Sequence, residues 1–218
     1  MVNSTSDERS GAANTFDLFT IGHSNHPIGR FVELLERSGV TDLVDVRTVP
    51  SSGRYPWFKR DALAQRLPRH KIAYRTQGHA LGGRPRDPRL FCDGVADYEA
   101  MAKTPEFRAG LDRVIDEAKA GRLCLMCSER EPLDCHRCLL IGRALAERGL
   151  RIGHILADGS VEPHKVTEER LLELASEPDL FSTDMGAWLA AAYRRRARTF
   201  AFRAEPAPAK GAKGKVKR

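Results

Sequence analysis

The sequence lacks any long hydrophobic run. No stretch approaches the ~18 consecutive apolar residues that a membrane-spanning helix needs, so we expect no membrane partner. Residues 1–13 lack the apolar segment of a secretory signal, which predicts a cytoplasmic location. With 41% apolar and 30% charged residues, the composition is that of a soluble globular protein.

Most of the chain also lacks a strong net charge. The total charge is +7, but residues 194–218 hold ten Lys or Arg and one acidic residue, so residues 1–193 carry −2. A broad phosphate-binding face is therefore not expected on the folded part. The basic tail 194–218 is expected to bind nucleic acid or another polyanion, or else to serve only as a solubilising extension. The sequence predicts no oligomeric state.

Cysteine is scarce outside one short segment. The chain has five cysteines, and four of them lie within residues 124–138. An odd number gathered in one place is not the pattern of a disulfide framework. In a reducing compartment this pattern indicates thiol chemistry, metal binding or burial of the thiols in the core.

Short apolar segments alternate with segments of helical periodicity, which predicts an α/β fold. We expect a mostly parallel, helix-covered open sheet, that is, a single doubly wound domain followed by C-terminal helices and a disordered basic tail. The strands are expected at 16–21, 43–46, 72–75, 123–127 and 152–156, and the helices at 28–38, 59–69, from 105 onward, 135–148, 166–176 and 183–196. The predicted divisions are a disordered N-terminus (1–14), the α/β domain (15–165), a helical extension (166–198) and the disordered tail (199–218).

Polar and thiol-bearing residues follow all five predicted strands. In a parallel sheet, the ligand site lies outside the carboxyl ends of the strands, so these residues are expected to meet at one edge. In chain order they are His23, Ser24, Asn25, Asp45, Arg47, Gly82, Gly83, Cys127, Glu129, Cys135, His136, Arg137 and His164.

Five motifs at these positions resemble a known family. They are TIGHSN (20–25), LVDVRTVPSS (43–52), LGG (81–83), LMCSEREPLDCHR (125–137) and HILADGSVEPH (154–164). Together they resemble the uncharacterised bacterial family catalogued as domain of unknown function 488, over roughly residues 16–164. The resemblance implies family membership and no particular reaction. It also implies that the positions of Cys127, Glu129, Cys135, His136 and Arg137 recur in the family, whereas those of Cys124 and Cys138 do not.

The two family cysteines are the candidate reactive thiols. Cys127 ends a predicted strand, and Cys135 lies at a predicted helix start, where unpaired N–H groups lower the pKa of a thiol. Either thiol is a candidate nucleophile with Glu129 or a histidine as base, and the alternative is that both only pack the junction. Cys124 and Cys138 are expected in the core. A four-cysteine zinc site is disfavoured because only seven residues separate the two pairs.

The same helix start is a candidate anion site. Backbone N–H groups together with Arg137 and Arg47 suit a phosphate, and the alternative is that these arginines pair with Asp45 and Glu129 in a buried network. A mixed zinc or iron site of Cys127, Cys135, His136 and His164 is a further alternative.

Three smaller features complete the expected cleft. His23 is expected either to act as an acid–base group or to be a buried core histidine. Ser24 and Asn25 are expected to donate hydrogen bonds, and one of them to cap the next helix. Gly82 and Gly83 are expected either to let a ligand approach the backbone closely or to form an ordinary turn.

The leading hypothesis is an enzyme with a phosphate-containing substrate, a nucleotide or a nucleic acid. Its expected catalytic residues are Cys127, Cys135, Glu129 and His23. Its expected substrate-binding residues are Ser24, Asn25, Asp45, Arg47, Gly82, Gly83, His136 and Arg137. The alternatives are a nucleic-acid-binding module without catalysis and a Cys/His metal-binding protein.

Overall fold

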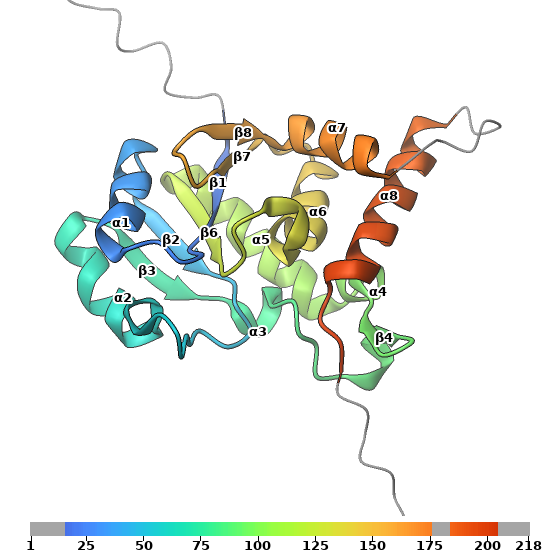
Figure 1. The fold of residues 1–218 in the computed structure, drawn as a ribbon, viewed down its shortest axis with the longest axis horizontal. Helices are drawn as coiled ribbons and strands as arrows, with labels where there is room; N and C mark the ends of the chain where they lie inside the picture. The colour runs from blue at the N-terminus through green and yellow to red at the C-terminus, as the bar shows by residue number, and fades with distance from the viewer. Residues whose placement is uncertain (1–15, 176–183, 205–218) are drawn as a thin grey trace, which may run out of the picture.

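The computed structural model describes residues 16–175 and 184–204, and its centre is a six-stranded sheet (Figure 1). The strand order is β3-β2-β6-β1-β7-β8, in which the first five strands are parallel and β8 runs antiparallel to β7. The strands are β1 (Leu18–Gly22), β2 (Asp42–Asp45), β3 (Ala73–Thr76), β6 (Leu123–Cys127), β7 (Ile152–Ile155) and β8 (Val161–Pro163). The predicted α/β class with a mostly parallel sheet is confirmed, and β8 is the strand of this sheet that the sequence did not indicate.

Both faces of the sheet are buried under helices. Helices α1 (Ile28–Arg37) and α2 (Arg60–Arg66) cover one face with residues such as Phe31 and Leu63. Helices α5 (Pro105–Ala120), α6 (Arg143–Ala146) and α7 (His164–Leu174) cover the other. Because its two faces enter different cores, β6 is buried at all five positions, which explains its unbroken apolar sequence.

Local signals account for how two of these helices begin. Helix α5 begins as predicted, with Pro105 in its first turn and the Thr104 hydroxyl accepting a hydrogen bond from the backbone N–H of Phe107. Helix α1 is preceded by Pro27 and has no side-chain cap. The expectation that Ser24 or Asn25 caps this helix is therefore wrong.

The predicted helix 135–148 is divided in the structure. A 3₁₀ helix at Pro132–Asp134 comes first, and Cys135 and His136 then lead into a π-helix at Arg137–Gly142, which continues as α6. π-Helical turns are rare and often lie at functional sites. The division turns the backbone sharply at Cys135, directly beside the end of β6.

The segments around residues 78–102 form small elements that the sequence did not predict. They are α3 (Gly78–Leu81), the hairpin of β4 (Phe91–Cys92) and β5 (Val95–Ala96), and α4 (Tyr98–Ala102). Single 3₁₀ turns lie at Pro56–Phe58, Leu67–His70 and Pro88–Leu90.

The C-terminal extension returns to this hairpin. Helix α8 (Met185–Phe200) runs beyond the expected end of the helical extension. After it, Ala96 N–H donates to Phe202 O at 2.8 Å, and Ala204 N–H donates to Gly94 O at 2.9 Å. The structure thus places residues 199–204, the first part of the predicted disordered tail, against the domain. The rest of that tail and the predicted disordered N-terminus lie outside the described residues.

Four arginines of α8 contact the body of the protein. Arg194 pairs with Glu99, Arg196 with Asp134 and Arg198 with Asp93, and Arg195 donates to the carbonyl of Ala175. This part of the predicted polyanion-binding tail is therefore engaged within the fold. Among the described residues, no helix combines the length and apolar character needed to cross a membrane.

Candidate functional site

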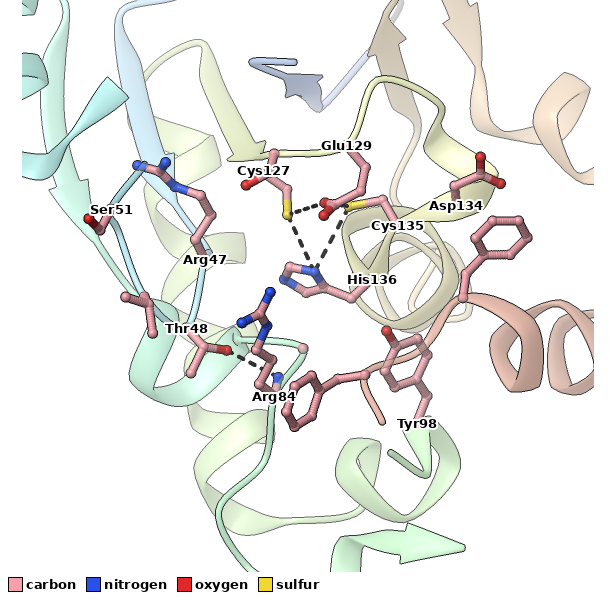
Figure 2. A pocket seen from close by; sticks show the side chains of 15 residues that line it. Arg47, Thr48, Ser51, Arg84, Tyr98, Cys127, Glu129, Asp134, Cys135 and His136 are labelled. Atoms are coloured by element: carbon pink, nitrogen blue, oxygen red, sulfur yellow. Dashed lines mark hydrogen bonds between the residues drawn. The ribbon is translucent and has the colours of Figure 1, made fainter. Parts of the chain in front are cut away.

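A cleft of about 300 Å³ opens at the carboxyl ends of β2 and β6 (Figure 2). Cys127, Glu129, Cys135 and His136 lie on one side of it. The opposite side is formed by Arg84, Tyr98, Phe200 and Phe202, which come from three other segments of the chain. The parallel pairing of β2 with β6 brings Arg47 and Cys127, which are 80 positions apart, to the same cleft, as the rule for strand ends predicts.

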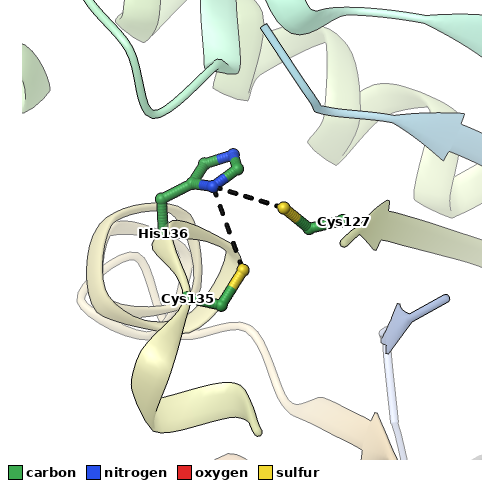
Figure 3. A group of neighbouring side chains, drawn as sticks. All are labelled: Cys127, Cys135 and His136. Carbon is green, nitrogen blue, oxygen red and sulfur yellow. Dashed lines mark hydrogen bonds between the residues drawn. The ribbon is translucent and has the colours of Figure 1, made fainter. Parts of the chain in front are cut away.

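Two thiols and a carboxylate meet within hydrogen-bonding distance. Glu129 Oε2 lies 3.0 Å from Cys127 Sγ and 3.2 Å from Cys135 Sγ. The third partner is the imidazole of His136, whose Nδ1 is 3.4 Å from Cys127 Sγ and 3.9 Å from Cys135 Sγ (Figure 3). The thiols and the imidazole are buried, whereas Glu129 stands at the exposed rim.

The backbone fixes the orientation of the imidazole. His136 Nε2 lies 3.1 Å from Val46 O, and a carbonyl oxygen only accepts, so Nε2 carries a proton. Nδ1 is then the nitrogen that gains or loses a proton, and it faces both sulfurs. The Cys135 sulfur also accepts from the backbone N–H of Arg137 at 3.5 Å, as expected of a thiol at a helix start.

The two thiols have opposite pKa shifts. Burial works to raise the pKa of Cys135, but the hydrogen bond with Cys127, the charge of Arg137 and the contact with His136 lower it more. Its pKa is therefore well below that of an ordinary thiol. The pKa of Cys127 is raised by burial and by the adjacent Cys135. Cys135 is thus the more acidic thiol of the pair and forms a thiolate more readily than Cys127.

The neighbouring acid and base respond to this thiolate. The partly buried carboxyl of Glu129 has a raised pKa, first because of desolvation and then because of the charge of Cys135. Burial lowers the pKa of His136, but the hydrogen bond to Cys135 and its charge outweigh burial and raise it. Both groups therefore hold a proton more readily than they would in water.

The two predicted anion clamps are used inside the protein. Arg137 is fully buried and donates to the carbonyls of Glu129 at 2.5 Å and Arg130 at 3.0 Å. Arg47 forms a bidentate ion pair with Asp45 and donates to Phe58 O, and Figure 2 shows it turned away from the sulfurs. The sequence predicted either an anion clamp or a buried network for these two arginines, and the structure shows buried networks. The partner of Arg137 is the backbone carbonyl of Glu129 rather than its carboxylate.

His23 lies outside the thiol cluster. Its ring stacks on Phe58 at 4.2 Å, Nε2 accepts from Arg47 at 3.1 Å, and Nδ1 donates to Ser24 O at 3.0 Å. Burial and the nearby Arg47 charge lower the pKa of His23 to about 4, so the ring is neutral near pH 7. Of its two predicted roles, these contacts match the buried core histidine.

Of the remaining predicted binding residues, some line the cleft and others do not. Ser24 adopts a left-handed φ of 46° and bonds to Asn25, and neither residue lines the cleft. Asp45 is fully buried between Arg47 and Tyr74. Gly83 lines the cleft, and a Cβ on it would lie 2.7 Å from the His136 ring. Gly82 does not line the cleft and packs against Thr48.

His164 lies in a second cluster, with Cys138 and His154, and does not reach the two family cysteines. Tyr193 donates to Glu168 at 2.9 Å, so its oxygen accepts from His164 Nε2 at 3.1 Å. His164 Nδ1 then accepts from His154 Nε2 at 2.9 Å, and His154 Nδ1 accepts from the Thr20 hydroxyl at 2.7 Å. These groups form one directed chain of neutral hydrogen bonds. The predicted alternative of a metal site that joins His164 to Cys127, Cys135 and His136 is therefore wrong, because His164 begins α7 and is buried in the core.

Sequence reasoning missed the side of the cleft that faces the thiols. Figure 2 shows Arg84 pointing into the cleft directly after the LGG motif, and its guanidinium carbon lies 5.1 Å from the centre of the Phe202 ring. Tyr98 and Thr48 also line the cleft. The position of Arg84 next to two glycines was a usable signal, whereas nothing in the sequence linked Phe200 and Phe202 to this edge.

Fold and site together define an α/β protein with a thiol, imidazole and carboxylate cluster at the carboxyl edge of its sheet. Residues 27–144, more than half of the chain, match the family described as Domain of unknown function DUF488, and the chain belongs to this family. The matched segment contains the thiol cluster but not β7, α7 or α8. Searches of curated proteins and of solved structures each returned no match.

Proposed function

We propose that this chain is an enzyme that binds a phosphate-containing substrate, a nucleotide or the end of a nucleic acid, in the cleft. The observation that carries the proposal is the convergence of Cys127, Glu129, Cys135 and His136 on one side of a cleft with a cation and aromatic rings on the other. Groups of this kind perform acid–base and nucleophilic steps when they share a cleft.

The cluster supplies the reacting groups. The carboxyl of Glu129 stands at the rim, within 3.2 Å of both sulfurs, which suits it to exchange protons with a bound substrate. The sulfur of Cys135 is the strongest nucleophile among the groups there, because the N–H of Arg137 and the ring of His136 stabilise its negative form. His23, Arg137 and Asp45 support this site from outside the cleft.

The facing side of the cleft suits a nucleotide. Arg84 provides the positive charge that the sequence hypothesis assigned to Arg137, and it is exposed to solvent. Phe202 offers an aromatic ring with the Arg84 cation beside it, an arrangement on which bases stack, and the buried Tyr98 contributes to the same wall. A cleft of about 300 Å³ is at the lower end of the usual range for small-molecule sites and suits a mononucleotide better than a duplex.

A binding experiment with AMP and inorganic phosphate tests this proposal. We expect calorimetry to show AMP binding to the wild type and roughly tenfold weaker binding to Arg84→Gln, the loss of about 1.4 kcal/mol typical of a charged hydrogen bond. Arg86→Gln is the matched control, because Arg86 is an exposed neighbour that does not line this cleft. Equal binding by the two variants, or no binding of AMP at millimolar concentration, contradicts the proposal.

A nucleic-acid-binding module without catalysis is the second candidate. Its supporting observation is the group of basic residues from Lys210 to Arg218, which follow Phe202, a residue of the cleft wall, in the sequence. Deletion of residues 205–218 separates the candidates. A deletion that abolishes binding of single-stranded oligonucleotides and leaves AMP binding to the cleft intact assigns polyanion binding to the tail alone.

A further inference from the structure

The thiol cluster brings three metal-binding side chains to one point. Cys127 ends β6, while Cys135 and His136 lie in the sharp turn before the π-helix, and Figure 3 shows the three side chains facing one another. Their two Sγ atoms and the His136 Nδ1 all lie within 4.8 Å of one another. Two thiolates and an imidazole are donors that zinc prefers, and a set of two Cys and one His is known for zinc sites that keep an open position.

The outer contacts of these side chains are also those of metal ligands. A metal-binding histidine usually donates its second ring N–H to a carbonyl or carboxylate, and His136 Nε2 donates to Val46 O at 3.1 Å. This contact leaves the Nδ1 lone pair directed at the two sulfurs. The N–H of Arg137 donates to Cys135 Sγ. Because Gly83 has no side chain, the His136 ring can pack directly against its backbone. The three donors are therefore held in position by the backbone around them.

From this geometry we infer that Cys127, Cys135 and His136 bind one zinc ion, with the Glu129 carboxylate beside the position that opens to the cleft. Glu129 Oε2 lies 3.0 and 3.2 Å from the two sulfurs, so it is the nearest acidic group to the point where the donors converge. A bound zinc ion acts as a Lewis acid toward a water molecule or a substrate oxygen. With zinc bound, the Cys135 sulfur would be a ligand, so an oxygen nucleophile polarised by the metal beside Glu129 would take the place of that sulfur in the proposed function.

The second cluster is the obvious competitor for a metal ion. Cys138, His154 and His164 also lie within 4.8 Å of one another. However, all four of its imidazole nitrogens already take part in the directed hydrogen-bond chain from Thr20 to Glu168. A metal ion there would have to break the 2.9 Å bond between the two rings, whereas at the first cluster the contacts of His136 Nδ1 among the described residues are to the two sulfurs that would themselves be ligands.

Metal analysis of untagged protein purified without chelator tests the inference. We expect one zinc per chain in the wild type, its removal by a chelator and its return with zinc chloride. Cys135→Ser and His136→Gln should lose the zinc, whereas Cys138→Ala and His164→Gln, the matched variants of the second cluster, should retain it. Arg84→Gln should also retain it, because Arg84 makes no contact with the three donors among the described hydrogen bonds.

Cobalt(II) in place of zinc gives a second measurement that needs no variant to fold. Thiolate-to-cobalt charge-transfer absorption in the wild type is expected, and it should appear as one equivalent of cobalt is added. A wild type that holds no zinc after purification or after incubation with zinc chloride overturns the inference, as does zinc that leaves with His164→Gln and stays in Cys135→Ser. A zinc-free wild type that still binds AMP through Arg84 would overturn the metal site alone and leave the proposed function standing.

Discussion

Gly83 lies so close to the His136 ring that position 83 has no room for a side chain. A Cβ placed on Gly83 would lie 2.7 Å from His136 Cγ and 3.0 Å from His136 Nδ1. The φ of Gly83 is not in the left-handed region, so the requirement for glycine here is one of space rather than of backbone conformation. The LGG loop therefore sets the position of the ring that faces the two sulfurs.

Gly83→Ala should consequently disturb the cluster. The new methyl group must displace the His136 ring or the loop, and overpacking of this kind costs about 1–3 kcal/mol of the free energy of unfolding. Urea denaturation measures this loss, and calorimetry with AMP measures its effect on the cleft. Gly29→Ala is the control, because nothing lies within 4 Å of its Cβ position in α1, and it should raise the stability by roughly 0.5–1 kcal/mol. Equal urea midpoints for the two variants would refute this account of Gly83.

Arg137→Met tests the buried arginine behind the cluster. The guanidinium donates to the backbone carbonyls of Glu129 and Arg130, and its removal leaves two polar groups without their partner. We expect a loss of about 2–4 kcal/mol in the free energy of unfolding, since each buried group left unsatisfied costs about 1–3 kcal/mol. Arg89→Met removes an exposed arginine whose only ion pair among the described residues is with the nearby Asp87, and its urea midpoint should match that of the wild type. A midpoint unchanged in Arg137→Met would show that the two carbonyls find other partners.

Acidification should loosen the packing of α7 and α8 through His164. Burial lowers the pKa of His164 from 6.5 to about 4, so between these values the unfolded chain binds a proton that the folded chain does not. Stability is therefore full above pH 6.5 and falls toward pH 4, by at most about 3 kcal/mol for a shift of this size. The groups around the ring are His154, Tyr193, Glu168 and Cys138.

The free energy of unfolding measured from pH 4 to pH 8 checks this expectation. His164→Gln has no proton to gain and should show a smaller decrease over this range than the wild type. Lys165→Gln is the control at the neighbouring exposed position, and it should keep the wild-type slope. A His164→Gln slope equal to that of the wild type would assign the acid sensitivity to other groups, such as His154, whose pKa burial also lowers.

Arg196→Met should release the C-terminal helix from the cleft. Arg196 donates to Leu133 O at 3.1 Å, pairs with Asp134 at 2.5 Å and stacks on Phe200 at 4.2 Å. Loss of about 1 kcal/mol of docking energy should speed proteolysis of residues 184–204 about fivefold, because cleavage follows the population of the open form. Arg194→Met removes a more exposed ion pair and is the control. A rate equal to that of the control would mean that apolar contacts alone hold α8.

The sequence predicted the elements that surround the site more completely than the directions of its side chains. The strand-end rule needs only the order of strands and helices, and it indicated that Cys127 and Cys135 lie on the same edge. The direction of Arg137 depends on the π-helix and on carbonyls exposed by the turn at residues 129–130, neither of which has a periodicity signal. Phe202 lies 66 positions beyond His136, and its place depends on a β-bridge formed by the next residue with Val95. Long-range contacts of this kind have no local pattern in a single sequence.

Part of the wall of the cleft lies outside the segment that matches the family. The cluster of Cys127 to His136 lies within the segment that matches the family, whereas Phe200 and Phe202 lie in the extension beyond it. A substitution or a replacement in the extension therefore changes what fits the cleft and leaves the sulfurs, the imidazole and the carboxylate untouched.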